Sequence, residues 1–170
     1  CIPPDGLDRV CICGPDDLHG ELPWFASAYF SNNHLVIERL ENDSGWIYVP
    51  WRIAGRCEML LGTATLAERP RPYQLEVELA RGTVNRLRNQ LFQWRFVGLE
   101  IPDSLWQIVQ KATRHFSRAA TSQQDPAAAA EYAETAIASA LDGMDALVSI
   151  YSAQAIAVRR SQAPGLNTLL

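Results

Sequence analysis

Two glutamates stand two residues apart in the segment LEVELARG, at Glu76 and Glu78. Paired carboxylates are the groups with which most glycosidases cleave a glycosidic bond. The apolar residues around them recur every three or four positions, which indicates a helix. Side chains two residues apart on a helix point roughly 200° apart, so these carboxylates cannot flank one bond. We therefore expect no catalytic pair here, and the chain offers no catalytic residue.

Arginines follow these glutamates along the same helix. Because a planar guanidinium donates several hydrogen bonds at once, it is suited to anchoring carbonyls and carboxylates. We predict a structural ion-pair network of four residues: Glu78, Arg81, Arg86 and Arg88. It would fasten the helix to the preceding part of the chain or to a neighbouring domain; the alternative is a solvated face. Gly82, in the middle of this helix, lowers helix stability by about 1 kcal/mol relative to alanine. A glycine that is kept at this cost indicates close approach by another element.

Aromatic residues gather in the first third of the chain. Trp46 and Tyr48 alternate in a strand-like run and would share one face of a sheet. Aromatic faces of this kind can stack on pyranose rings, and asparagine or aspartate in an adjoining turn can bond sugar hydroxyls. The candidate carbohydrate-binding residues are Trp46, Tyr48, Trp51, Asn42 and Asp43. The alternative, which suits most of the aromatics, is that they form the core.

Cysteines and histidines could in principle hold a metal. The four cysteines are Cys1, Cys11, Cys13 and Cys57. A C-x-C pair is not the spacing of a zinc site, and His19 and His34 do not supply it. We expect no metal and no cofactor, and cysteines that act as small buried hydrophobes in a reducing compartment. The sequence has neither a glycine-rich phosphate loop nor a G-x-S-x-G motif.

The charge distribution argues against a nucleic-acid partner. Net charge is −4, and residues 1–70 hold five arginines against ten acidic residues. A phosphate backbone requires the opposite balance. No run of about 18 apolar residues is present, so no membrane span is expected, and no signal peptide is recognisable. The first residue is cysteine rather than methionine and the sequence ends abruptly at Leu170, so we expect a piece of a longer polypeptide.

Short alternating runs separated by turn residues predict a β-rich first part. The expected strands are residues 8–13, 25–30, 34–40, 46–53 and 56–65. Pro50 lies inside one of them, which indicates an edge position or a bulge. These lengths favour a small antiparallel sheet or half-sandwich.

Helical periodicity dominates from residue 73 onward. The first helix should end at Gly98, the second should begin at the N-cap pair Asp103-Ser104, and the third at Asp125-Pro126. The third should run to about Arg160 with one apolar stripe. We therefore predict an α+β fold in which a three-helix antiparallel bundle packs on the sheet. The expected division is 1–69 as a β-rich part similar to a carbohydrate-binding module, 70–162 as the helical part, and 163–170 as the start of a linker.

Two strings in the joint between these parts carry a family resemblance: TATLAER at 63–69, and ELARG followed by NRLRNQ between 78 and 90. They resemble the N-terminal region of glycoside hydrolase family 10-like (xylanase-like) proteins of Planctomycetes. In those proteins a β-rich and a helical segment precede a TIM-barrel hydrolase domain, and the similarity runs from about Trp46 to Leu170. The resemblance implies a glycan context. The paired glutamates of such a barrel would lie beyond Leu170, so no catalytic residue is carried over.

Three functional hypotheses follow. The first is a non-catalytic accessory domain of a glycoside hydrolase, whose partner is polysaccharide or a downstream catalytic domain. The second is a structural or oligomerisation module that self-associates through the long third helix. The third is an independent glycosidase.

Overall fold

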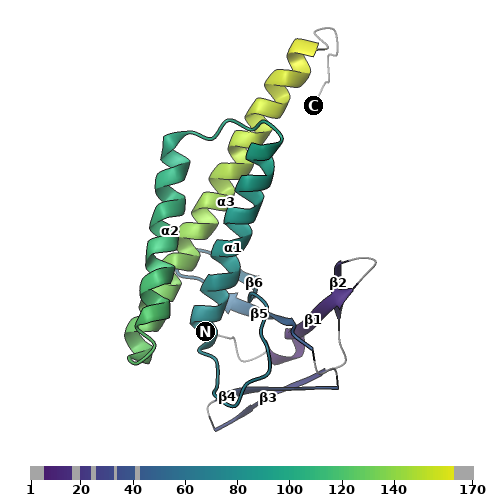
Figure 1. Ribbon diagram of the computed structural model, residues 1–170, viewed down its shortest axis with the longest axis vertical. Helices are drawn as coiled ribbons and strands as arrows, with labels where there is room; N and C mark the ends of the chain where they lie inside the picture. The colour runs from purple at the N-terminus through teal and green to yellow at the C-terminus, as the bar shows by residue number, and fades with distance from the viewer. Residues whose placement is uncertain (1–5, 17–19, 24–25, 33, 41–42, 163–170) are drawn as a thin grey trace.

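The chain forms an α+β fold in which antiparallel sheets precede three long helices, as the sequence predicts (Figure 1). The computed structural model describes residues 6–16, 20–23, 26–32, 34–40 and 43–162, with 15–16 and 20–23 described by backbone alone. After a 3-10 turn at Leu7–Arg9, the strands are β1 Cys11–Asp16, β2 Gly20–Pro23, β3 Ala26–Ser31, β4 His34–Arg39, β5 Trp46–Arg52 and β6 Glu58–Gly62. The helices are α1 Leu75–Phe96, α2 Asp103–Thr121 and α3 Pro126–Gln162.

The main sheet has the antiparallel order β2-β1-β5-β6, and β3 and β4 form a separate hairpin. β5 is thus a central strand in the order of the sheet, but the edge position that Pro50 indicates is found locally. The pairing of β1 with β5 ends at Tyr48, whereas Pro50 pairs with Leu60 of β6. Proline is tolerated because β5 is bordered on only one side at this point, and a missing N–H there breaks no ladder.

The N-terminal strands differ most from the expectation. β1 begins at Cys11, later than predicted, and continues through Gly14 to Asp16, beyond the predicted end at residue 13. Its partner β2 is not predicted at all. Gly14 pairs with Leu22 in this hairpin, so pairing overrides the low strand propensity of glycine and proline. The turn between β3 and β4 is confirmed, with Asn32 at φ 49°, a conformation that asparagine tolerates better than most residues.

The predicted helix boundaries are confirmed, although the capping residue of α2 differs from the predicted one. α1 ends before Gly98, whose φ of +103° allows Leu99 N–H to donate to the carbonyl of Trp94 at 2.9 Å. Asp125 accepts a hydrogen bond from Ala128 N–H at 3.2 Å and so caps α3. At α2 the N-cap is Pro102, and the predicted cap Asp103 is already the first helical residue.

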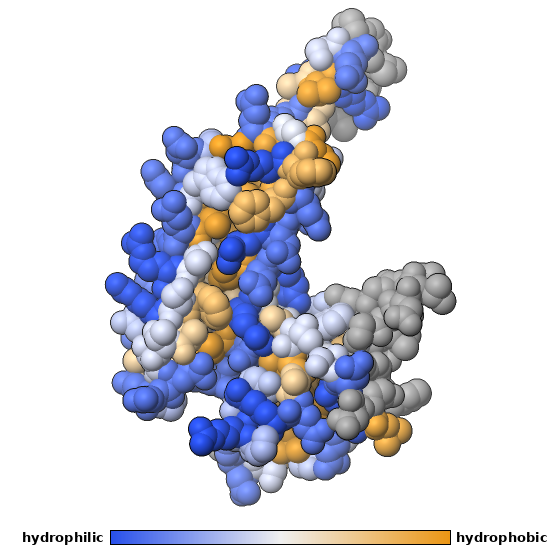
Figure 2. Space-filling model, viewed as in Figure 1, coloured by the Kyte–Doolittle hydropathy of each residue, from blue (hydrophilic) through white to orange (hydrophobic). Residues whose placement is uncertain are grey.

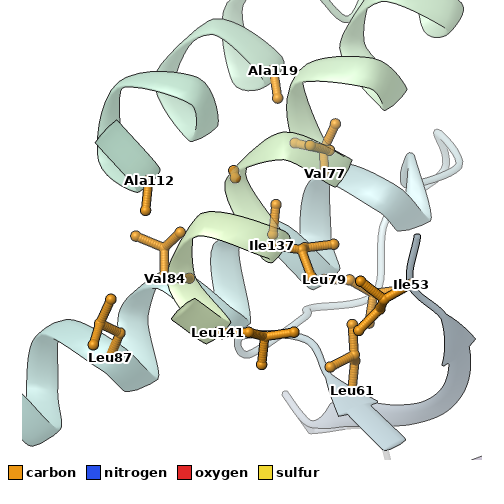
Figure 3. Packing of buried hydrophobic residues seen from close by; sticks show 14 of the residues in the cluster. Ile53, Leu61, Val77, Leu79, Val84, Leu87, Ala112, Ala119, Ile137 and Leu141 are labelled. Atoms are coloured by element: carbon orange, nitrogen blue, oxygen red, sulfur yellow. The ribbon is translucent and has the colours of Figure 1, made fainter. Parts of the chain in front are cut away.

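One hydrophobic core joins the sheet to the bundle. Figure 3 shows Ile53, which follows β5, and Leu61 of β6 beside Leu79 of α1 and Leu141 of α3. Ala129, Ala133, Ala136 and Ala140 of α3 are fully buried, and their small size lets α1 and α2 approach closely. The β-rich and helical parts therefore share a single core.

α3 is longer than its neighbours and projects beyond them at its C-terminal end (Figure 1). The predicted apolar stripe is buried or half-buried from Tyr132 to Leu147, but Ala155 and Val158 are exposed. The stripe fails there because α1 ends at Phe96 and α2 begins at Asp103, so the joint between them closes the bundle below this segment.

Candidate functional site

The joint between β6 and α1 is a close backbone contact. A Cβ placed on Gly82 would lie 2.1 Å from the carbonyl oxygen of Gly62 and 2.5 Å from the carbonyl carbon of Thr63. Only glycine allows a helix to approach a strand end so closely. The close approach that Gly82 predicts is therefore confirmed.

Two predicted arginines anchor this joint from α1. Arg86 donates to the carbonyl of Gly62 at 2.8 Å and to that of Thr63 at 3.4 Å, and its guanidinium carbon lies 5.5 Å from the centre of the Tyr48 ring. Arg81 donates to the carbonyl of Thr65 at 2.9 Å. These bonds satisfy carbonyls just beyond the end of β6, as the planar guanidinium fork suits.

The ion-pair network itself is smaller than expected. Glu78 is buried, and its Oε2 lies 2.7 Å from Arg81 Nη2. Arg88 is exposed and makes no hydrogen bond or ion pair with any residue that the structure describes. Arg88 is exposed on α1, so within the described residues the alternative of a solvated face applies to it, and its contact with a neighbouring domain stays a prediction.

The predicted aromatic surface is divided between the two faces of the sheet. Trp46 and Tyr48 share a face and are half-buried, as their alternation predicts. Trp51 points to the opposite face and is only 3% exposed within the core, so it cannot join a platform with them. Asp43 is exposed and accepts a hydrogen bond from Ser44 N–H, and Asn42 lies outside the described residues.

No group of three histidine, cysteine, aspartate or glutamate side chains within the described ranges could hold a metal ion. Cys11 Sγ and Cys13 Sγ lie 3.6 Å apart on one face of β1. Cys13 is buried, as expected, whereas Cys57 is exposed, contrary to the expectation. Cys1 lies outside the described residues. Among the described helices, none is long and apolar enough to cross a membrane.

A pocket of about 300 Å³ opens where the end of β5 meets α2 and α3. We name it the Trp51 pocket, after the side chain that contributes to its apolar wall. Its polar lining comes from Arg52, Lys111, Glu131, Glu134, Thr135, Ser139 and Asp142. Glu131, Glu134, Ala138 and Asp142 follow one another at helical spacing and so present one stripe of α3 to the pocket. The sequence interpretation missed these residues, although this recurrence of acidic positions along one helix face was a readable signal.

Arg56 binds Asp142, one of the residues that line the Trp51 pocket. It donates to Asp142 at 2.7 Å and to Asp145 at 2.8 Å, which ties the turn after β5 to α3. These two hydrogen bonds raise the pKa of Arg56 above its ordinary value. Asp142 is therefore already paired, whereas Glu131 and Glu134 have no ion-pair partner within the described part of the chain.

At the far end of the bundle, large apolar side chains are exposed around the C-terminal halves of α1 and α3. We name them the distal surface: Phe92, Phe96, Val97, Val148, Tyr151, Ile156 and Val158. Trp94 stacks on Tyr151 at 4.4 Å between ring centres, which brings the two helices side by side here. Figure 2 shows apolar side chains gathered over this end of the bundle.

No protein-family model matches the chain, and no match is found among curated proteins or among solved structures.

Proposed function

We propose that this chain is a non-catalytic accessory domain of a glycoside hydrolase, which docks on the catalytic barrel through the distal surface. The observation that carries the docking is the exposure of the distal surface: Phe96 is 92% exposed and Val97 is 75% exposed. Large apolar side chains that gather on an exposed surface mark an interaction site. The glycan context comes from the TATLAER and NRLRNQ strings.

The arrangement of the two glutamates of α1 supports an accessory role over a catalytic one. Glu76 and Glu78 follow each other on α1, where Glu78 is buried against Arg81. A carboxylate that is held in an ion pair at a structural joint is a poor general acid. The third hypothesis, an independent glycosidase, thus has no pair of facing carboxylates to support it on this helix.

The experiment measures docking directly. The 170-residue chain is titrated, by isothermal calorimetry, against a separately produced barrel from a family 10-like protein that carries the same two strings upstream. We expect saturable binding that the double variant Phe96→Asp/Val97→Asp abolishes. The matched control is Leu60→Asp, because Leu60 is a large apolar residue that is 58% exposed on β6, away from the distal surface. Absence of heat with the unmodified chain would refute the docking.

A second candidate function is self-association through the same surface. It is favoured by the projecting end of α3, on which Ile156 and Val158 are each about half exposed. Two copies could bury these side chains against each other. Light scattering over a hundredfold dilution separates the two functions: a dimer that persists on dilution and that excludes the barrel favours self-association.

A further inference from the structure

We propose that the Trp51 pocket binds the terminal unit of a neutral sugar chain. The sugar-binding role deepens the proposed accessory function and rests on it. The site differs from the sheet face of Trp46 and Tyr48, because it lies on the opposite side of β5, against α2 and α3. Its volume of about 300 Å³ is at the lower end of ligand pockets, which suits one small polar unit.

Two buried polar groups in the lining are available to a ligand. Ser139 is 4% exposed and Trp51 is 3% exposed, and both line the pocket. Among the described residues, neither the Ser139 hydroxyl nor the Trp51 indole N–H has a hydrogen-bond partner. Neither atom is among the fully buried side-chain atoms that lack a partner, so both stay accessible and can bond a hydroxyl of a ligand in the pocket.

The charged side chains at the rim of the pocket are exposed and can bond a ligand. Glu131 and Glu134 offer acceptors, while Lys111 and Arg52 offer donors. None of these four forms an ion pair with another described residue, although all line one pocket. They therefore stand too far apart to neutralise each other and surround the space between them.

The presence of both acidic and basic side chains in the lining indicates the class of ligand. An anion would face Glu131, Glu134 and Asp142, and an organic cation would face Lys111 and Arg52. A neutral sugar avoids both penalties, because each hydroxyl can donate to a carboxylate and accept from an ammonium, guanidinium or indole N–H. The apolar part of the wall, which includes Ile53 and Ile137, suits the C–H face of the ring.

The test uses nuclear magnetic resonance on the nitrogen-15-labelled 170-residue chain. The chain has five tryptophans, so five indole N–H signals are expected, and Trp51→Phe identifies the one in the pocket. Xylohexaose, cellohexaose, mannohexaose and laminarihexaose are titrated separately. We expect at least one to shift the Trp51 indole signal in a saturable manner while the Trp94 signal stays in place.

Variants connect the shift to the pocket. Glu131→Gln/Glu134→Gln should weaken binding at least about tenfold, since a hydrogen bond to a charged group contributes about that much. The control is Glu68→Gln, an exposed glutamate between β6 and α1, which should bind as the unmodified chain does. Because Glu131 and Glu134 are exposed, their replacement leaves the fold intact, which circular dichroism verifies.

Three results would overturn the proposal: no oligosaccharide shifts the Trp51 signal, the shift survives unchanged in the double glutamine variant, or spermidine shifts it while the neutral sugars do not. These results are independent of the docking experiment. Failure at the distal surface with binding here would reject docking alone, and the converse would reject the sugar pocket alone.

Discussion

Gly82 is the residue on which the contact between sheet and bundle depends most directly. Replacing it with alanine puts a methyl group against the backbone of Gly62 and Thr63, which cannot rotate away. We expect Gly82→Ala to lower the free energy of unfolding by about 3 kcal/mol, despite the better helix propensity of alanine. Urea denaturation followed by circular dichroism measures it.

The matched control is Gly143→Ala on α3. Its new methyl group would meet the end of the Leu87 side chain at 2.7 Å, and a side chain can change rotamer where a backbone cannot. We expect a loss of about 1 kcal/mol or less. Equal losses for the two variants would show that the approach of α1 to the strand end is not the limiting contact.

Arg86 and Arg88 lie on the same helix two residues apart and should behave differently. Arg86→Ala leaves the carbonyls of Gly62 and Thr63 without a donor and should cost about 1–3 kcal/mol. Arg88→Ala removes an exposed side chain that has no described partner and should change stability by about 0.5 kcal/mol or less. Chemical denaturation of both variants in one buffer measures the two changes in the free energy of unfolding.

His115 gives the fold a pH dependence. Burial, followed by the charges of Arg118, Lys111 and Arg114, lowers the pKa of His115 below 6.5. Its Nδ1 is buried without a described partner, and the Tyr132 ring lies 6.3 Å away. The folded state therefore resists a proton that the unfolded chain accepts at about pH 6.5.

The contribution of this histidine is complete above pH 6.5 and is lost as the pH falls toward the lowered pKa. We expect the free energy of unfolding to decrease between pH 7.5 and 5.5 in the unmodified chain. In His115→Gln the decrease should be smaller. A steeper decrease in the variant would contradict the lowered pKa.

At the scale of elements, helices were predictable and strands were less so. Periodicity over long segments gave α1 and α3, and Gly98 and Asp125 marked their ends through local bonds. β2 could not be predicted, because its strand exists only through pairing with β1. The place of Trp51 in the core, rather than among the candidate sugar-binding residues, was left open because aromatic type alone does not reveal which face of β5 lies against the bundle.

The end of α3 should be separable from the rest of the element. Residues 155–162 are exposed, whereas Gln154 still bonds both the N–H and the carbonyl of Glu100. A chain that ends at Ala155 should lose about 1 kcal/mol or less of its free energy of unfolding, so its denaturation midpoint should change little. It should also lose helical ellipticity in proportion to the residues removed. A large fall in the midpoint would mean that the projecting end stabilises the bundle.

For the whole molecule, the shared core predicts a single cooperative unit. Ile53, just after β5, and Leu61 of β6 pack in the same cluster as the buried residues of all three helices. We expect tryptophan fluorescence and far-ultraviolet circular dichroism to report one coincident unfolding transition. Two separated transitions would show that the β-rich part and the bundle unfold independently.

The projecting helix also sets a length scale. The Trp51 pocket lies along the first half of α3 and the distal surface along the second half. From Glu134 to Ile156 an α-helix rises roughly 33 Å, at about 1.5 Å for each residue. α3 therefore acts as a rigid spacer, which would hold a captured sugar end some three nanometres from any domain docked at the other end.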